Sequence, residues 1–140
     1  VNVKGTFLCC KHVVPHMIER KSGKIINMAS IAGKCGWSPA RMLPHYCASK
    51  AAVINFTENL AMVLGEYGIN VNDICPAYVW TDLWKTALGG ETGKSSLEEV
   101  IKDTTIQKRM TTAEKIAALA VFLASEDGDD ITAQSIDVGS

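Results

Sequence analysis

The sequence predicts an α/β fold in which helices cover a parallel β-sheet. Segments with helical periodicity alternate with short apolar segments in the order helix, strand, helix, strand, helix, strand. The short segments are nearly continuous apolar runs, which is typical of strands covered on both faces. Strands that alternate with helices are joined by right-handed crossovers, so these strands should run parallel.

The composition is that of one ordinary domain. The chain has 140 residues, of which 47% are hydrophobic, enough for a core. A net charge of -1 gives no reason to expect nucleic acid or a membrane surface as a partner, and no apolar run is long enough to span a bilayer. The five cysteines form no CxxC pair and predict reduced thiols in a cytoplasmic protein. The chain starts at Val1 within a helical pattern, which suggests a fragment.

The first helix is expected from Asn2 to Arg20, followed by a strand from Lys24 to Ala29 that ends at Ser30. Pro15 should bend or interrupt the helix because it removes a backbone donor. The apolar residues that predict one broad buried face of the helix are Val3, Phe7, Leu8, Val13, Val14, Met17 and Ile18.

A glycine- and proline-containing loop from Ile31 to His45 should lead into a second helix, from about Tyr46 to Glu66. A buried strand from Ile69 to Cys75 follows and is closed by Pro76. The residues expected to bury the second helix are Ala52, Val53, Phe56, Leu60, Val63 and Leu64.

The segment from Ala77 to Met110 has no strong periodicity, apart from an amphipathic piece near Leu97 to Ile101. An irregular segment of this length in a compact domain is usually functional, and a lid is expected. Thr112 should cap a helix that runs to Ser125 and is followed by a strand from Ile131 to Val138. The inner face of that helix is expected to contain Ile116, Leu119, Ala120, Phe122 and Leu123.

Tyr46 and Lys50 carry the clearest chemical signal. They are four positions apart at the start of a helix, so they share one face of it. A lysine cation near a phenol favours the phenolate, and such a tyrosine can give and take a proton near neutral pH. Ligands of open parallel sheets bind at the carboxyl ends of the strands, where Ser30 and residues 76–81 also lie.

Several stretches together resemble the carboxyl-terminal part of a short-chain dehydrogenase/reductase. They are residues 2–7, 23–30, 46–52, 67–72, 75–77 and 131–135, which occur in the family's order. The resemblance implies a Rossmann-like, doubly wound parallel sheet with flanking helices, present only as its C-terminal half. Residues 1–140 would then form the C-terminal part of a single oxidoreductase domain, and the chain alone is expected to be inactive.

The resemblance implies four catalytic residues, Asn2, Ser30, Tyr46 and Lys50. Tyr46 would be the general acid for ketone reduction and the base for alcohol oxidation. Ser30 would hydrogen-bond the substrate oxygen. Lys50 would assist Tyr46 and bind the nicotinamide ribose, and Asn2 would hold a water that relays protons to Lys50.

The implied cofactor is NAD or NADP. Tyr46 and Lys50 would bind it together with Pro76, Val79 and Thr81, whose spacing resembles the family's nicotinamide-binding segment. Ala77 stands where the family usually has glycine. The glycine-rich turn that binds the pyrophosphate is absent, as is the residue that selects NAD or NADP.

The expected substrate is a small neutral alcohol or ketone, and no metal is expected. Helices 2–20 and 46–66 are expected to pair in a homodimer or homotetramer, as is common in the family. His12 and His16 are four apart on a helix, but no further ligand has a fitting spacing. Two alternatives stay open: a catalytically inactive or truncated relative that binds cofactor, and a subunit-interaction module.

Overall fold

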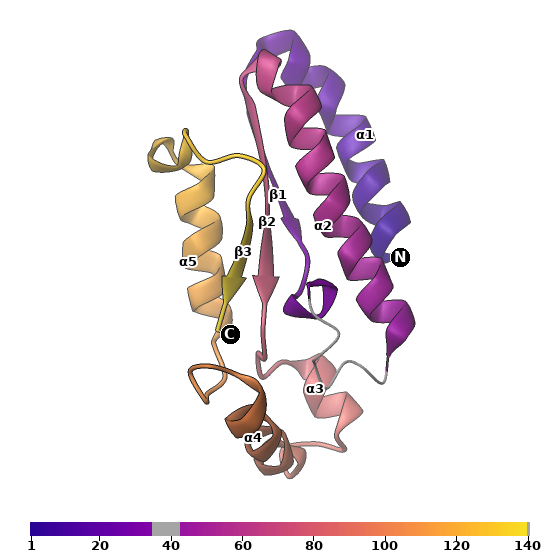
Figure 1. The fold of residues 1–140 in the computed structure, drawn as a ribbon, viewed down its shortest axis with the longest axis vertical. Coiled ribbons are helices and arrows are strands. Elements are labelled where there is room, and N and C mark those ends of the chain that lie inside the picture. The colour runs from indigo at the N-terminus through magenta and orange to yellow at the C-terminus, as the bar shows by residue number, and fades with distance from the viewer. Residues whose placement is uncertain (35–42, 140) are drawn as a thin grey trace.

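Three parallel strands form the sheet, as the sequence predicts. The computed structural model describes residues 1–34 and 43–139. In these residues the strands are β1 (Gly23–Met28), β2 (Ile69–Pro76) and β3 (Ser135–Val138), in the order β1-β2-β3. Ile25 pairs with Val71 and Ile74 pairs with Ile136, and both pairs of strands are parallel. Their carboxyl ends therefore point the same way (Figure 1).

Two long helices cover one face of the sheet. They are α1 (Asn2–Arg20) and α2 (Pro44–Leu64), which lie side by side in Figure 1. The fully buried hydroxyl of Thr57 on α2 accepts a hydrogen bond of 2.9 Å from the Asn27 amide on β1. The apolar core between this face and the helices contains Cys10, Ile25, Ala61, Leu64, Ile69 and Val71.

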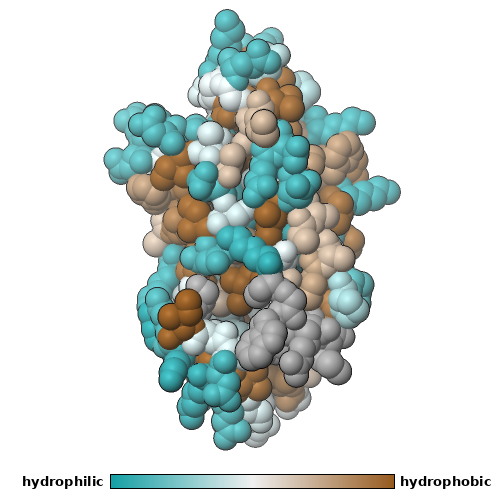
Figure 2. All heavy atoms as spheres, in the orientation of Figure 1, coloured by the Kyte–Doolittle hydropathy of each residue, from teal (hydrophilic) through white to brown (hydrophobic). Residues whose placement is uncertain are grey.

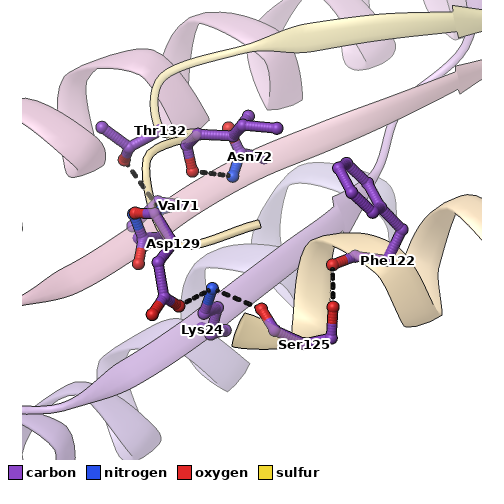
Figure 3. A network of polar contacts seen from close by, with 9 residues as sticks. Lys24, Val71, Asn72, Phe122, Ser125, Asp129 and Thr132 are labelled. Carbon is purple, nitrogen blue, oxygen red and sulfur yellow. Dashed lines mark hydrogen bonds and ion pairs between the residues drawn. The ribbon is translucent and has the colours of Figure 1, made fainter. Parts of the chain in front are cut away.

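The other face is covered by α5 (Ala113–Ala124), in which Leu123 is fully buried. Side chains alternate along a strand, so Lys24 points away from the face to which Ile25 belongs. The Lys24 ammonium donates to the Ser125 carbonyl at the end of α5 (2.8 Å) and forms an ion pair of 2.5 Å with Asp129 (Figure 3). This clamp joins α5 to the amino-terminal end of β1.

The carboxyl ends of the strands carry the remaining elements. A short 3-10 turn, η1 (Ile31–Gly33), follows β1, and α3 (Asp82–Ala87) and α4 (Gly93–Thr104) follow β2 (Figure 1). The expectation of an irregular segment from Ala77 to Met110 was therefore largely wrong. The helix α4 forms because Leu97 and Ile101, one turn apart, pack on Tyr78.

Several element boundaries differ from those predicted. The second helix begins at Pro44 rather than Tyr46, because proline is favoured at the first helical position. The last strand begins at Ser135 rather than Ile131, and Ala133 has a positive φ of 57° that is incompatible with a regular strand. Pro15 does not interrupt α1. Residues 35–42 of the predicted loop lie outside the described part of the chain.

Some side chains expected in the core are exposed instead. Val63 is 62% exposed, Phe122 is 41% exposed and Phe7 is 48% exposed. Three strands cover only the inner stripe of each helix, so the flanks of the predicted apolar faces reach the surface, and Figure 2 shows apolar groups between polar ones.

Thr112 also differs from its predicted role. It occupies the N-cap position of α5, but its side chain makes no capping hydrogen bond. The backbone amide of Glu114 and the Thr112 hydroxyl bond the Glu114 carboxylate and lower its pKa. A carboxylate in the first turn of a helix takes over the favourable interaction with the helix dipole.

We predict that Asn72→Ala lowers the free energy of unfolding by about 2–3 kcal/mol, because two backbone groups lose their partner at a buried site. Asn72 is 1% exposed, and it donates to the Ile131 carbonyl (2.8 Å) and accepts from the Gln134 amide (3.0 Å). Denaturant unfolding followed by circular dichroism measures the change. Asn70→Ala is the control, because half-buried Asn70 makes a single hydrogen bond, to the Asp129 carbonyl. Equal losses for the two variants would contradict the prediction.

Candidate active site

Ser30 lies where β1 ends and η1 begins. The Ala29 amide donates to the Ile74 carbonyl (2.8 Å), which keeps β1 paired with β2 up to this point. The Ser30 side chain is the N-cap of η1, and its hydroxyl oxygen accepts a hydrogen bond of 3.2 Å from the Ala32 amide. The hydroxyl is therefore held at the carboxyl end of the sheet, beside the end of β2.

Tyr46 and Lys50 lie in the first turns of α2, on the same edge of the sheet. The Lys50 ammonium lies 5.9 Å from the centre of the Tyr46 ring, as expected for residues on one helix face. It donates to the Met28 carbonyl at 2.8 Å, two residues before Ser30. This bond ties the start of α2 to the end of β1 and brings Tyr46, Lys50 and Ser30 to one place.

Gly33 allows this close approach. A Cβ atom at Gly33 would lie 2.7 Å from the Lys50 carbonyl carbon and 2.7 Å from the Ala51 amide nitrogen. Both contacts are with backbone atoms, which cannot move aside as a flexible side chain would. Residue 33 must therefore be glycine if η1 is to lie directly against α2.

Burial lowers the pKa of Lys50, and a smaller effect from Cys75 acts in the opposite direction. Its partner is a neutral carbonyl rather than a carboxylate, so no full negative charge offsets the loss of water. A lysine in this environment releases its proton more readily than one on the surface.

Asn2 is the first residue of α1 and lies beside the first turn of α2. Its side-chain amide donates to the Ser49 hydroxyl (2.9 Å), which in turn donates to the Tyr46 carbonyl (2.7 Å). These two hydrogen bonds connect Asn2 to Ser49, the residue next to Lys50, and through Ser49 to the Tyr46 backbone. They place Asn2 beside the amino-terminal part of α2, which carries Tyr46 and Lys50.

Residues 76–81 form the other side of the strand ends. Pro76 ends β2, the Ala77 amide donates to the Val138 carbonyl (2.9 Å), and Val79 forms an isolated bridge with Thr111. Thr81 is the N-cap of α3, yet its hydroxyl makes no capping bond. Ala77 is not among the non-glycine residues with positive φ, so alanine fits where the family usually has glycine.

A polar cluster that the sequence analysis missed lies between β2 and β3. The fully buried Asp73 carboxylate accepts from the Cys75 thiol (3.1 Å) and from the Ser135 hydroxyl (2.6 Å). Lys34 pairs with Asp137 (2.7 Å) and donates to the Ser135 carbonyl (2.5 Å). The available signal was the alternation of Ser135 and Asp137 on one face of the last strand, with a charged Asp73 inside an apolar strand.

Burial and the neighbouring charges in this cluster shift the pKa values of Cys75 and Lys34. Burial raises the pKa of Cys75 to about 12, with further contributions from Asp73. Burial lowers the pKa of Lys34, but its hydrogen bond and ion pair with Asp137 outweigh this, and the pKa of Lys34 is raised overall. Lys34 is thus held as a cation at neutral pH.

Within residues 1–34 and 43–139, no three His, Cys, Asp or Glu side chains are grouped so that they could hold a metal ion. None of the helices in these ranges is both long and apolar enough to cross a membrane. Cys9, Cys10 and Cys75 are free thiols, and Cys35 lies outside the described residues.

A family model described as "Enoyl-(Acyl carrier protein) reductase" matches residues 1–140. Among curated proteins, galactitol 2-dehydrogenase of Agrobacterium fabrum is 40% identical over 144 residues, covering 99% of this chain and 55% of the relative. The NAD-dependent glycerol dehydrogenase of Listeria innocua is 38% identical over 138 residues, covering 97% of this chain and 50% of the relative. The chain thus spans about half the length of these curated relatives.

Solved structures agree with this similarity. Levodione reductase superposes with a TM-score of 0.86 at 32% identity, covering 99% of this chain and 54% of that protein. A 3-oxoacyl-[acyl-carrier protein] reductase from Brucella melitensis, solved with bound NAD, has a TM-score of 0.80 at 32% identity and covers 99% and 47%. ElxO, solved with NADP bound, has a TM-score of 0.85 at 28% identity and covers 98% and 53%. The observed half-sheet is therefore part of a Rossmann-like fold.

We predict that Cys75 resists alkylation in the native protein while Cys9 is modified. The reactive form is the thiolate, and a pKa of about 12 leaves only about one Cys75 thiol in 10,000 ionised at pH 8. Cys75 is also fully buried, whereas Cys9 is exposed. Iodoacetamide at pH 8 followed by peptide mass spectrometry measures both sites, with labelling in denaturant as the control. Equal native labelling of the two cysteines would contradict this prediction.

Proposed function

Because the chain belongs to the short-chain dehydrogenase/reductase family, we propose that it supplies the proton-transfer side of an NAD(P)-dependent oxidoreductase. The reaction would interconvert a secondary alcohol and a ketone. The observation that carries the proposal is the bond from the Lys50 ammonium to the Met28 carbonyl (2.8 Å). It joins the Tyr46–Lys50 pair on α2 to the strand end that carries Ser30.

In ketone reduction, Tyr46 is proposed to donate its phenolic proton to the substrate oxygen while Ser30 hydrogen-bonds the same oxygen. In alcohol oxidation, Tyr46 removes the hydroxyl proton. Lys50 stabilises the tyrosinate that forms, and Asn2 supports the first turn of α2 and the proton relay. When bound, the nicotinamide ring supplies or accepts the hydride, which no side chain can do.

The residues of this edge fit the nicotinamide end of the cofactor. An ammonium group has three donors, and the Met28 carbonyl takes one from Lys50, so donors remain for ribose hydroxyls. The uncapped Thr81 hydroxyl and the backbone of Val79 next to Pro76 would hold the carboxamide. The pyrophosphate would be bound by the other half of the fold. Below, "complete enzyme" means this chain together with that other half. Residues 1–140 would form the carboxyl-terminal part of the complete enzyme.

A small neutral alcohol or ketone is the proposed substrate. The relatives are named for galactitol, glycerol and levodione. Residues 77–110 are proposed as a lid over the site, with the apolar side chains of Leu83 and Trp84 on α3, of which Leu83 is 76% exposed. Apolar side chains in such a lid would exclude water from the hydride transfer. Residues 77–110 contain a single arginine, Arg109, rather than an arginine cluster for a phosphorylated substrate.

A second proposal concerns assembly, and the exposed apolar residues of the long helices favour it. Phe7 of α1 is 48% exposed, and Met62 and Val63 of α2 are 81% and 62% exposed. Pairing of helices 2–20 and 46–66 between subunits would cover these residues and give a homodimer or homotetramer, in the cytoplasm. The alternative is an inactive relative that serves only as such a subunit-interaction module. The variants described next distinguish the two, because only an active enzyme has a turnover that they can lower.

Tyr46→Phe in the complete enzyme is expected to lower kcat for ketone reduction by about 10²–10⁴-fold, because it removes the proton donor and keeps the ring. Cofactor affinity, measured by NAD(P)H fluorescence titration, should stay near that of the parent. Tyr67→Phe is the control, since Tyr67 packs against the core below α2. Turnover near the parent rate in Tyr46→Phe would show that this tyrosine is not the acid.

Alcohol oxidation in the complete enzyme is expected to rise with pH to a plateau, because the base must be unprotonated. Lys50→Met should move the midpoint of this profile to higher pH and weaken cofactor binding, since it removes the cation that favours the phenolate. Steady-state rates from pH 6 to 11 measure the shift. Lys115→Met on α5, outside the proposed lid, is the matched control and should leave the profile in place. An unmoved midpoint in Lys50→Met, with chemistry limiting the rate, would exclude the coupling.

A further inference from the structure

We infer that Lys34 is a positioning residue for Ser30. Lys34 holds the turn η1 against β3 through its ion pair with Asp137, and thereby fixes the position of Ser30. The inference rests on the proposed function, because it assigns Lys34 a part in placing the serine that would bind the substrate oxygen. Lys34 itself is not expected to touch substrate or cofactor.

The turn connects the two residues tightly. Ser30 caps its amino end through the Ala32 amide (3.2 Å), and the Gly33 amide donates to the Ser30 carbonyl (2.9 Å). The amide of Lys34 at the other end donates to the Ile31 carbonyl (3.0 Å). These bonds leave little freedom between the two ends, so a displacement of Lys34 is passed on to Ser30.

Lys34 is fastened at two points on β3. Its ammonium lies 2.7 Å from an Asp137 carboxylate oxygen and donates to the Ser135 carbonyl at 2.5 Å. The side chains of Lys34 and Asp137 are 31% and 39% exposed, so the pair is partly shielded from water. A surface ion pair usually contributes little to stability. Here the Ser135 carbonyl is a second acceptor and fixes the position of the Lys34 ammonium.

The opposite side of the turn is held by α2. Gly33 packs directly on the backbone of Lys50 and Ala51, as its lack of a Cβ atom allows. The turn is therefore held between α2, which carries Tyr46 and Lys50, and β3, which carries Asp137. The position of the Ser30 hydroxyl relative to Tyr46 depends on both contacts.

The carboxylates near Lys34 give a physical reason for a cation at the end of η1. Among the described residues, the buried Asp73 carboxylate accepts hydrogen bonds from the Cys75 thiol and the Ser135 hydroxyl, and neither donor carries a positive charge. Lys34 interacts electrostatically with both Asp73 and Asp137. Loss of the lysine would leave two carboxylates on adjacent strands without this compensation, and the strand end would shift to rehydrate them.

The test compares Lys34→Met with Lys24→Met in the complete enzyme. Lys24 makes the same kind of clamp, with Asp129 and the Ser125 carbonyl, but at the opposite end of the sheet (Figure 3). Both variants should lower Tm. Only Lys34→Met should lower kcat for ketone reduction, by about 10- to 100-fold, because a displacement of about 1 Å in a catalytic group has effects of this size. Its KM for NAD(P)H should stay unchanged.

Two further variants separate positioning from general stability. Lys34→Arg keeps the charge and the donors and should recover most of the lost kcat. In a Ser30→Ala background, Lys34→Met should cause no further loss, because its effect passes through Ser30. Asp137→Asn, a milder change, should lower kcat in the same direction and covers the case in which Lys34→Met does not fold.

The inference is overturned if Lys34→Met lowers only Tm, as Lys24→Met does, or if its effect on kcat multiplies fully with that of Ser30→Ala. The proposed function fails separately, if Tyr46→Phe stays active. An inactive Tyr46→Phe together with an unaffected Lys34→Met and Asp137→Asn would reject the role of Lys34 alone.

Discussion

The parallel pairing of β1 with β2 is the constraint on which the candidate site depends. Asn27 pairs with Asp73 and Met28 with Ile74, so both strands end at the same edge of the sheet. The chain leaves β1 at this edge and enters α2 there, which places the first turns of α2 beside the strand ends. This path places Ser30, Tyr46 and Lys50 at the same edge of the sheet, and the Lys50–Met28 hydrogen bond holds the start of α2 against the end of β1.

Two lysines, Lys34 and Lys50, lie on either side of η1, and their environments shift their pKa values in opposite directions. Lys50 bonds a neutral carbonyl, and its burial lowers its pKa. Lys34 faces a carboxylate, and the pair with Asp137 raises its pKa in spite of burial. The first environment suits a group that assists proton transfer, and the second suits a charge that stays fixed. A difference of this kind within one short turn follows from the choice of acceptor, a carbonyl or a carboxylate.

The partial sheet also explains the surface. Three strands bury only the inner stripes of α1, α2 and α5, and the outer apolar residues such as Phe7, Val63 and Phe122 reach solvent. The curated relatives are about twice as long as this chain. In a larger fold or assembly such residues have further surfaces on which to pack, which gives a physical reason for apolar side chains at these positions.

The sequence by itself determined the order of the elements, the parallel sheet and the helix face shared by Tyr46 and Lys50. These follow from local rules, because periodicity and strand–helix alternation are properties of neighbouring residues. It did not predict α3, which is too short to show a period, nor the start of β3 after Ala133. The pairing of Lys34 with Asp137 and the burial of Asp73 between Cys75 and Ser135 were decided only by the tertiary structure. Asp137 and Ser135 lie about a hundred and about sixty residues along the chain from Lys34 and Asp73 respectively, and a pattern of buried positions does not say which distant residue each one contacts.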